Sequence, residues 1–161
     1  MEPHACRDQL ARLLTDESAL LSQLDRQLQG EHEFLSVNDV EGLEQAGAAR
    51  QETIARLLRL EDERRNLCRL LGHGADMSGL AAMMAWCDPA GSLAAAQSGC
   101  AQLAARCRAQ NERNGALATA RLRRVTGMLD MLADNTTSNT YQPDATRHSA
   151  TPSGRMVSVS A

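Results

Sequence analysis

Aromatic residues are scarce in this sequence, at 2% of the chain, and comprise only Phe34, Trp86 and Tyr141. A compact globular core of this length usually buries several large rings, because each ring removes a large apolar area from water. The hydrophobic residues, 43% of the chain, are instead mainly Leu, Ala, Met and Val. This composition favours long helices packed side by side over a single globular core.

Lysine is absent, so all 17 basic residues are Arg, and with 20 acidic residues the net charge is −3. Such a chain has no overall basic field to attract nucleic acid or anionic lipid. The sequence also shows no apolar run of membrane-spanning length and no apolar signal-peptide core near its first residues. We therefore expect a cytoplasmic protein with no nucleic-acid partner and no direct membrane insertion.

Motifs of catalysis and cofactor binding are also missing, since no Gly-rich phosphate loop, HExxH or nucleophile elbow occurs. An odd number of cysteines lies mostly within helical patterns, at Cys6, Cys68, Cys87, Cys100 and Cys107. The odd number of cysteines and their placement within helices favour reduced thiols over a disulfide framework. Cys100 and Cys107, one heptad apart, suit small core hydrophobes better than a metal or redox site. We expect no enzyme activity, no cofactor and no metal site.

Leucine periodicity predicts a first long helix over about residues 8–35 and a second over about 39–71. The first helix has a stripe that repeats every seven residues, at Leu14, Leu21, Leu28 and Leu35. A stripe held over several heptads indicates a coiled-coil-like partner helix. Asn38 is the expected N-cap of the second helix, and Gly72 is its expected terminator. The short connection favours an antiparallel hairpin.

A short helical insert is predicted over 77–87, and its Gly79–Cys87 stretch either plugs the end of the hairpin or offers a docking surface. Asp88 and Pro89 are expected to cap and begin a third long helix over 89–133. Apolar periodicity then stops, and residues 134–161 are expected to form a flexible, disordered tail. The predicted fold is all-α: an elongated antiparallel helical hairpin, or coiled-coil bundle, of three main helices in one domain over 1–133.

A polar, turn-like patch interrupts the last long helix at Asn111, Asn114 and Gly115, where Asn-Gly would ordinarily signal a turn. Asn in a helical seam lowers packing energy but fixes the register of the helices. Gly115 either loosens the following turns or permits the close approach of another helix. Beyond the patch, an amphipathic face continues to Leu132, and it either binds a partner helix or covers the first two helices.

The stretch "NERNGALATARLRRVTGMLDML", followed by "NTYQPDA", resembles the C-terminal part of the FlgN family of flagellar export chaperones. Members of that family carry an Asn-x-x-Asn-Gly element in their last long helix and a Thr-Tyr element in the tail. A looser resemblance extends over the chain to about Ala145. That residue stands where Gly is common in the family, and the segment after Thr146 matches no family pattern.

The resemblance implies a chaperone without ATPase activity for the hook-associated, hook–filament junction proteins. It would bind their terminal helical segments, prevent premature assembly and deliver them to the type III export gate. Tyr141 is the implied gate-docking residue. The implied cargo-binding residues lie on the last long helix, at Asn111, Asn114, Leu117, Leu122, Val125, Met128, Leu129 and Leu132. The alternative is a structural coiled-coil or dimerising adaptor without a secretion role, a possible homodimer.

Overall fold

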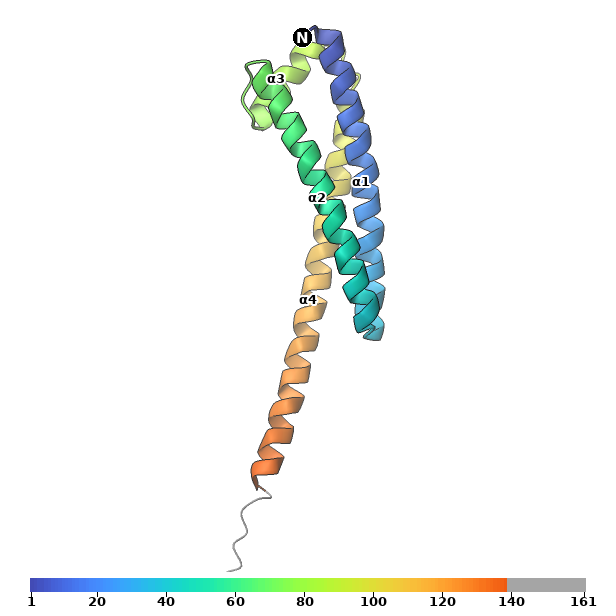
Figure 1. Cartoon of the computed structure of the whole chain (residues 1–161), viewed down its shortest axis with the longest axis vertical. Helices are drawn as coiled ribbons and strands as arrows, with labels where there is room; N and C mark the ends of the chain where they lie inside the picture. The colour runs from blue at the N-terminus through green and yellow to red at the C-terminus, as the bar shows by residue number, and fades with distance from the viewer. Residues whose placement is uncertain (139–161) are drawn as a thin grey trace, which may run out of the picture. The chain divides into compact units, whose positions relative to one another are not determined.

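The computed structural model describes the backbone of residues 1–138 and the side chains as far as Ala133. This part of the chain contains the helices α1 (Pro3–Val37), α2 (Val40–Leu70), α3 (Met77–Cys87) and α4 (Ala94–Ser138) (Figure 1). No strand occurs within residues 1–138, which confirms the all-α prediction. The chain divides into a first unit, Met1–Leu122, and a second, Arg123–Ala161.

The turn between α1 and α2 consists of Asn38 and Asp39. Asn38 ends α1 in the left-handed conformation, with a φ of 61°, which Asn tolerates better than most residues. Asp39 is the N-cap of α2, because its carboxylate accepts a hydrogen bond from the Gly42 N–H at 2.9 Å. The prediction that Asn38 caps α2 is therefore wrong by one residue.

The helices α1 and α2 lie side by side and run antiparallel (Figure 1). Near the turn, Arg50 Nη1 pairs with Glu31 Oε2 at 3.1 Å. Farther from the turn, Gln23 Nε2 donates to Thr53 Oγ1 at 3.2 Å, so residue numbers fall in α1 as they rise in α2. Predicted and observed bounds of both helices agree closely except at the start of α1, which begins at Pro3 instead of residue 8.

The helix α3 packs on the end of the hairpin that holds the N-terminus of α1 (Figure 1). Its Met83 is completely buried and belongs to the same apolar cluster as Cys6 and Cys68. A side chain on Gly79 would place its Cβ 1.8 Å from the carbonyl oxygen of Gly74, so the loop can pass α3 only because this position is glycine. The insert thus closes the end of the hairpin.

The start of α4 differs from the prediction, because the helix begins at Ala94 and not at Pro89. Asp88 closes a loop instead of capping a helix: its carboxylate accepts from the Leu93 N–H and the Ser92 hydroxyl, both at 2.7 Å. At its other end α4 continues to Ser138, past the predicted end at residue 133. The predicted tail from 139 onward lies outside the described residues.

Candidate partner-binding surfaces

Within the first unit, three side chains of α4 each donate a hydrogen bond to a main-chain carbonyl of α1. The pairs are Cys100 with Leu14 (3.4 Å), Cys107 with Leu21 (3.4 Å) and Asn114 with Leu28 (2.8 Å). Each step of seven residues along α4 matches seven along α1, so the two helices run parallel with their heptads paired. The α1 stripe found in the sequence is the surface that this part of α4 covers.

All five cysteines are buried, free thiols. Burial raises the pKa of Cys100 and of Cys107, and the neighbouring carboxylates of Glu17 and Asp25 raise them further. Both groups therefore stay protonated near neutral pH and can donate to the α1 carbonyls. Their role in this structure is packing and register, not nucleophilic chemistry.

The two asparagines of the polar patch have different environments. Asn114 is only 4% exposed; besides its bond to Leu28, its Oδ1 lies 3.1 Å from His32 Nδ1. Asn111 is exposed, and its Oδ1 accepts from Arg50 Nη1 at 3.2 Å. Asn114 therefore lies inside the α1–α4 interface, whereas Asn111 lies on the surface and links α4 to α2.

Two buried carboxylates of α1 escaped the sequence analysis. Asp25 accepts from Gln29 Nε2 at 2.9 Å and forms an ion pair with Arg106, while Glu31 pairs with Arg50. The signal was present in the sequence, because both residues fall within the leucine stripe of α1. A charged residue at such a position needs a partner on a neighbouring helix.

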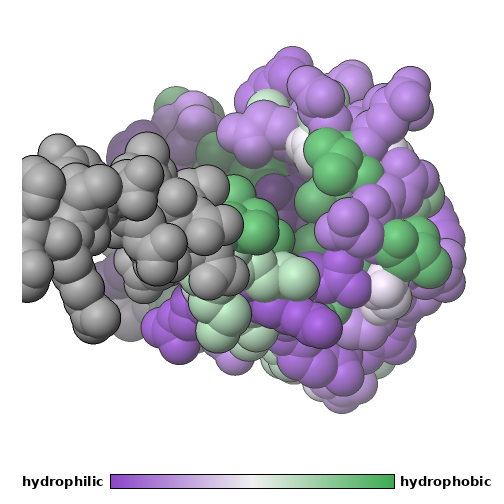
Figure 2. Space-filling view, turned by 90° about the horizontal axis from the view of Figure 1, so that it is seen from below, coloured by the Kyte–Doolittle hydropathy of each residue, from purple (hydrophilic) through white to green (hydrophobic). Residues whose placement is uncertain are grey.

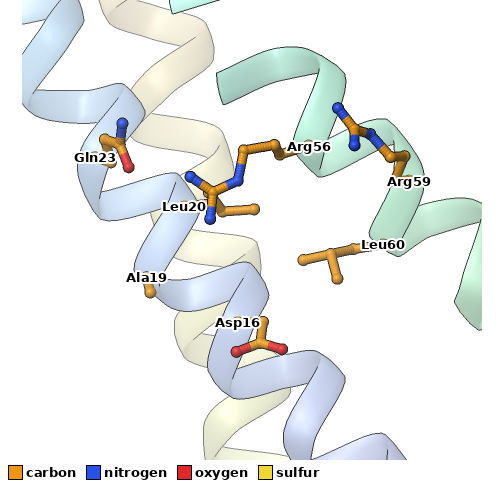
Figure 3. Close-up of a pocket in the computed structure, with 7 residues that line it drawn as sticks. All are labelled: Asp16, Ala19, Leu20, Gln23, Arg56, Arg59 and Leu60. Atoms are coloured by element: carbon orange, nitrogen blue, oxygen red, sulfur yellow. The ribbon is translucent and has the colours of Figure 1, made fainter. Parts of the chain in front are cut away.

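A hollow of about 370 Å³ lies between α1 and α2. Figure 3 shows Arg56 extending across it from α2 toward α1. The other lining residues are Asp16, Ala19, Leu20, Gln23, Arg59 and Leu60. They supply charged and apolar groups but no pairing of a nucleophile with a general base, so the hollow resembles an ordinary surface depression.

The predicted cargo-binding residues of α4 divide between the two units. Leu117 is half-buried and Leu122 exposed, both in the first unit. In the second unit four side chains follow the helical spacing i, i+3, i+4, i+7, and each is more than half exposed. We call them the α4 apolar face: Val125, Met128, Leu129 and Leu132. Tyr141 lies outside the described residues.

Other apolar side chains are exposed at the turn between α1 and α2. Val37 and Val40 are 73% and 70% exposed. In Figure 2, which views the molecule from below, green hydrophobic surface interrupts a mainly hydrophilic surface. Such scattered apolar side chains are common on soluble surfaces, so these two positions indicate no particular partner.

Among the described residues, none of the helices has the length and apolar character to cross a membrane. The same part of the chain holds no group of three or more His, Cys, Asp or Glu side chains arranged for a metal ion. The family model described as FlgN protein matches residues 1–149. No curated protein and no solved structure matches the chain.

Proposed function

Because the chain belongs to the FlgN family, a family of flagellar export chaperones, we propose that it serves type III export of the hook–filament junction proteins. In this proposal it is cytoplasmic, binds the terminal helical segments of these proteins, prevents their premature assembly and delivers them to the export gate. The observation that supports the proposal is the α4 apolar face, where four apolar side chains on one side of a helix are exposed together.

The α4 apolar face would act by burying cargo segments that are disordered before assembly. Burial of a Val, Leu or Met side chain contributes about 1.5–3 kcal/mol when it is complete. Since each of the four is a little over half exposed, the face would contribute roughly 4–7 kcal/mol before the cost of ordering the cargo. The net binding free energy would be smaller, because association and the ordering of the cargo both cost free energy. Binding through this face would therefore be weak enough to permit release without a hydrolysis step in the chaperone.

The other implied residues have supporting parts in this proposal. Asn111 stays on the surface beside the groove between α2 and α4, where cargo can reach it. Asn114 acts indirectly, because its buried amide holds α4 in register on α1. Tyr141 is the gate-docking residue on the strength of the Thr-Tyr element alone.

The test is a calorimetric titration of the full chain with terminal segments of the junction proteins. Leu129→Asp places a charge in the α4 apolar face and should abolish binding, because the carboxylate would be buried without a partner. Met131→Asp is the matched control, since Met131 is also exposed on α4 but lies away from the face, and its binding should be unchanged.

Two results would count against the proposal. The first is that no junction-protein segment binds the wild-type chain. The second is that the chain forms a dimer through the α4 apolar face, which would favour the structural adaptor. Sedimentation equilibrium without cargo identifies that second case, because a wild-type dimer that becomes a monomer in Leu129→Asp would assign the face to self-association.

A further inference from the structure

The segment that includes α3 is nearly free of charge. Residues 70–105 hold only two charged side chains, Asp76 and Asp88, although charged residues make up 23% of the chain. Asp88 is 6% exposed and holds the loop before α4, so Asp76 is the one exposed charge in this segment. The centre of a protein–protein interface is likewise poor in charged residues, while Met and Trp are enriched there. The composition of this segment is therefore typical of a contact surface.

The side of α3 that faces away from the hairpin consists of exposed, uncharged side chains. The opposite side, which packs on the hairpin, is buried through Gly79, Leu80, Met83 and Cys87. We call the exposed side the α3 outer face: Met77, Ser78, Ala81, Ala82, Ala85 and Trp86. Met77 is 67% exposed and Trp86 41% exposed, so two large apolar side chains contact water here. Trp is enriched among the residues that contribute most to binding between proteins.

The exposed carboxylate lies at the start of this face. Asp76 is the N-cap of α3, and its Oδ1 accepts from the Gly79 N–H at 2.8 Å and from the Ser78 hydroxyl at 2.9 Å. The bond from Gly79 lowers the pKa of Asp76, so the carboxylate is ionised at neutral pH. Within residues 1–133 Asp76 forms no ion pair. Its negative charge is therefore available to a basic group from outside the chain.

A hollow of about 290 Å³ gives access to this carboxylate between α2 and α3, and Asp76 and Met77 line it. Two arginines of α2, Arg64 and Arg65, line the same hollow, but both form ion pairs with Glu61. Asp76 is thus the carboxylate of this hollow that has no cationic partner among the described residues. A basic side chain could enter the hollow and pair with it.

The size and charge of the α3 outer face argue against a second copy of this chain as its occupant. The 11 residues of α3 span about 16 Å at 1.5 Å per residue. A stable interface uses roughly 20–30 residues from each partner, several times more than this face provides. Two copies joined here would also contribute two ionised Asp76 side chains and no basic residue from 70–105.

We propose that the α3 outer face docks another protein that presents an apolar patch bordered by Arg or Lys. The apolar side chains of the partner contact the alanines between Met77 and Trp86, and its basic side chain pairs with Asp76. Because the contact is small, docking is weak and reversible. The α3 outer face shares no residue with the α4 apolar face, so the inference does not depend on the cargo proposal.

Trp86 provides the assay, because it is the only tryptophan of the chain and lies on the α3 outer face. The probe is a stapled helix of about 14 residues without Trp, with a Leu stripe bordered by two Arg. A matched peptide has Glu in place of both Arg. Titration of the full chain carrying Leu129→Asp, which disables the α4 apolar face, should shift Trp86 emission to the blue and reduce its quenching by acrylamide. The Glu peptide should bind about fivefold more weakly, because it repels Asp76.

Two variants test the two parts of the contact. Asp76→Asn should fold normally, because Asn caps a helix as well as Asp does, yet it should bind the Arg and Glu peptides with affinities within about twofold. Ala85→Arg places a long cationic side chain on the α3 outer face and should weaken binding of the Arg peptide about tenfold or more. Ala48→Arg is the matched control, because Ala48 is an exposed alanine of α2 outside this face, and its affinity should be unchanged.

Four results would overturn the inference: no response of Trp86 to the Arg peptide, equal affinity for the Arg and Glu peptides, normal binding by Ala85→Arg, or equal losses in Ala85→Arg and Ala48→Arg. Acrylamide quenching that increases when the chain is diluted without peptide would assign the face to a second copy of this chain instead. Failure of the junction-protein segments to bind would not affect these readings, since the assay uses neither the segments nor the α4 apolar face.

Discussion

The same substitution, Asn→Asp, should have opposite outcomes at Asn114 and Asn111, three residues apart. Asn114 uses its amide as a donor, because Nδ2 bonds to the Leu28 carbonyl oxygen at 2.8 Å. In Asn114→Asp a buried carboxylate oxygen would face that carbonyl. The lost hydrogen bond costs about 1 kcal/mol and the poorly paired charge about 1–3 kcal/mol, so unfolding free energy should fall by roughly 2–4 kcal/mol at neutral pH. Asn111 uses its oxygen as an acceptor from Arg50, and Asp accepts equally well. Asn111→Asp should therefore change stability by less than about 0.5 kcal/mol.

Urea unfolding followed by far-UV circular dichroism measures both variants against the wild type. Burial should raise the pKa of the carboxyl introduced at Asn114. Its protonated form can donate to the Leu28 carbonyl, so stability should recover as the pH falls through that raised pKa. Equal losses in the two variants, or a loss at Asn111 alone, would refute the assignment of donor and acceptor roles.

Three further predictions concern the end of the hairpin that α3 closes. Gly79→Ala should lower the melting temperature, because the new Cβ would lie 1.8 Å from the Gly74 oxygen. Relieving that clash costs about 1–3 kcal/mol. An unchanged melting curve would contradict the close passage of the Gly74 loop past α3. Cys6 should react with iodoacetamide at pH 8 only after unfolding, because burial raises its pKa to about 12; rapid labelling of the folded chain would be inconsistent with that. The hydrogen bond from the Leu93 N–H lowers the pKa of Asp88 in the folded chain. The ionised Asp88 carboxylate therefore stabilises the fold at any pH above the pKa that it has in the unfolded chain. This contribution is lost as the pH falls through the lower pKa that Asp88 has in the folded chain. Asp88→Asn should therefore unfold with a weaker pH dependence below about pH 4 than the wild type, and an identical dependence would count against this role.

The helices were predictable because their evidence is local. Heptad leucines predicted α1, and the bounds of α3 matched the expected insert over 77–87. Capping was harder, because neighbouring polar residues compete for the same role. Asn38 and Asp39 are both good cap residues, and only the backbone decides which takes the left-handed conformation. Asp88 was misassigned for a related reason, since its carboxylate can serve a loop as well as a helix.

The surfaces were less predictable than the helices, because a sequence does not show which residues of distant helices meet. The stripe of α4 could cover α1 or face outward, and the structure shows its first part packed on α1 through Cys100, Cys107 and Asn114. Pairing of Glu31 with Arg50 depends on the register of α1 against α2, which the periodicity of either helix alone does not determine. Gly115 could be read as loosening the helix or as allowing the close approach of another helix, and within the described residues nothing lies within 4 Å of a Cβ at this position, so no helix of the chain packs closely on it.

The most direct test of the chaperone proposal is hydrogen exchange of the full chain, measured by mass spectrometry with and without a bound junction-protein segment. The proposal predicts that amides over 123–133, which carry the α4 apolar face, become strongly protected in the complex and that Leu129→Asp abolishes this protection. A complex that forms while exchange over 123–133 stays unchanged would contradict the assignment of cargo binding to this face.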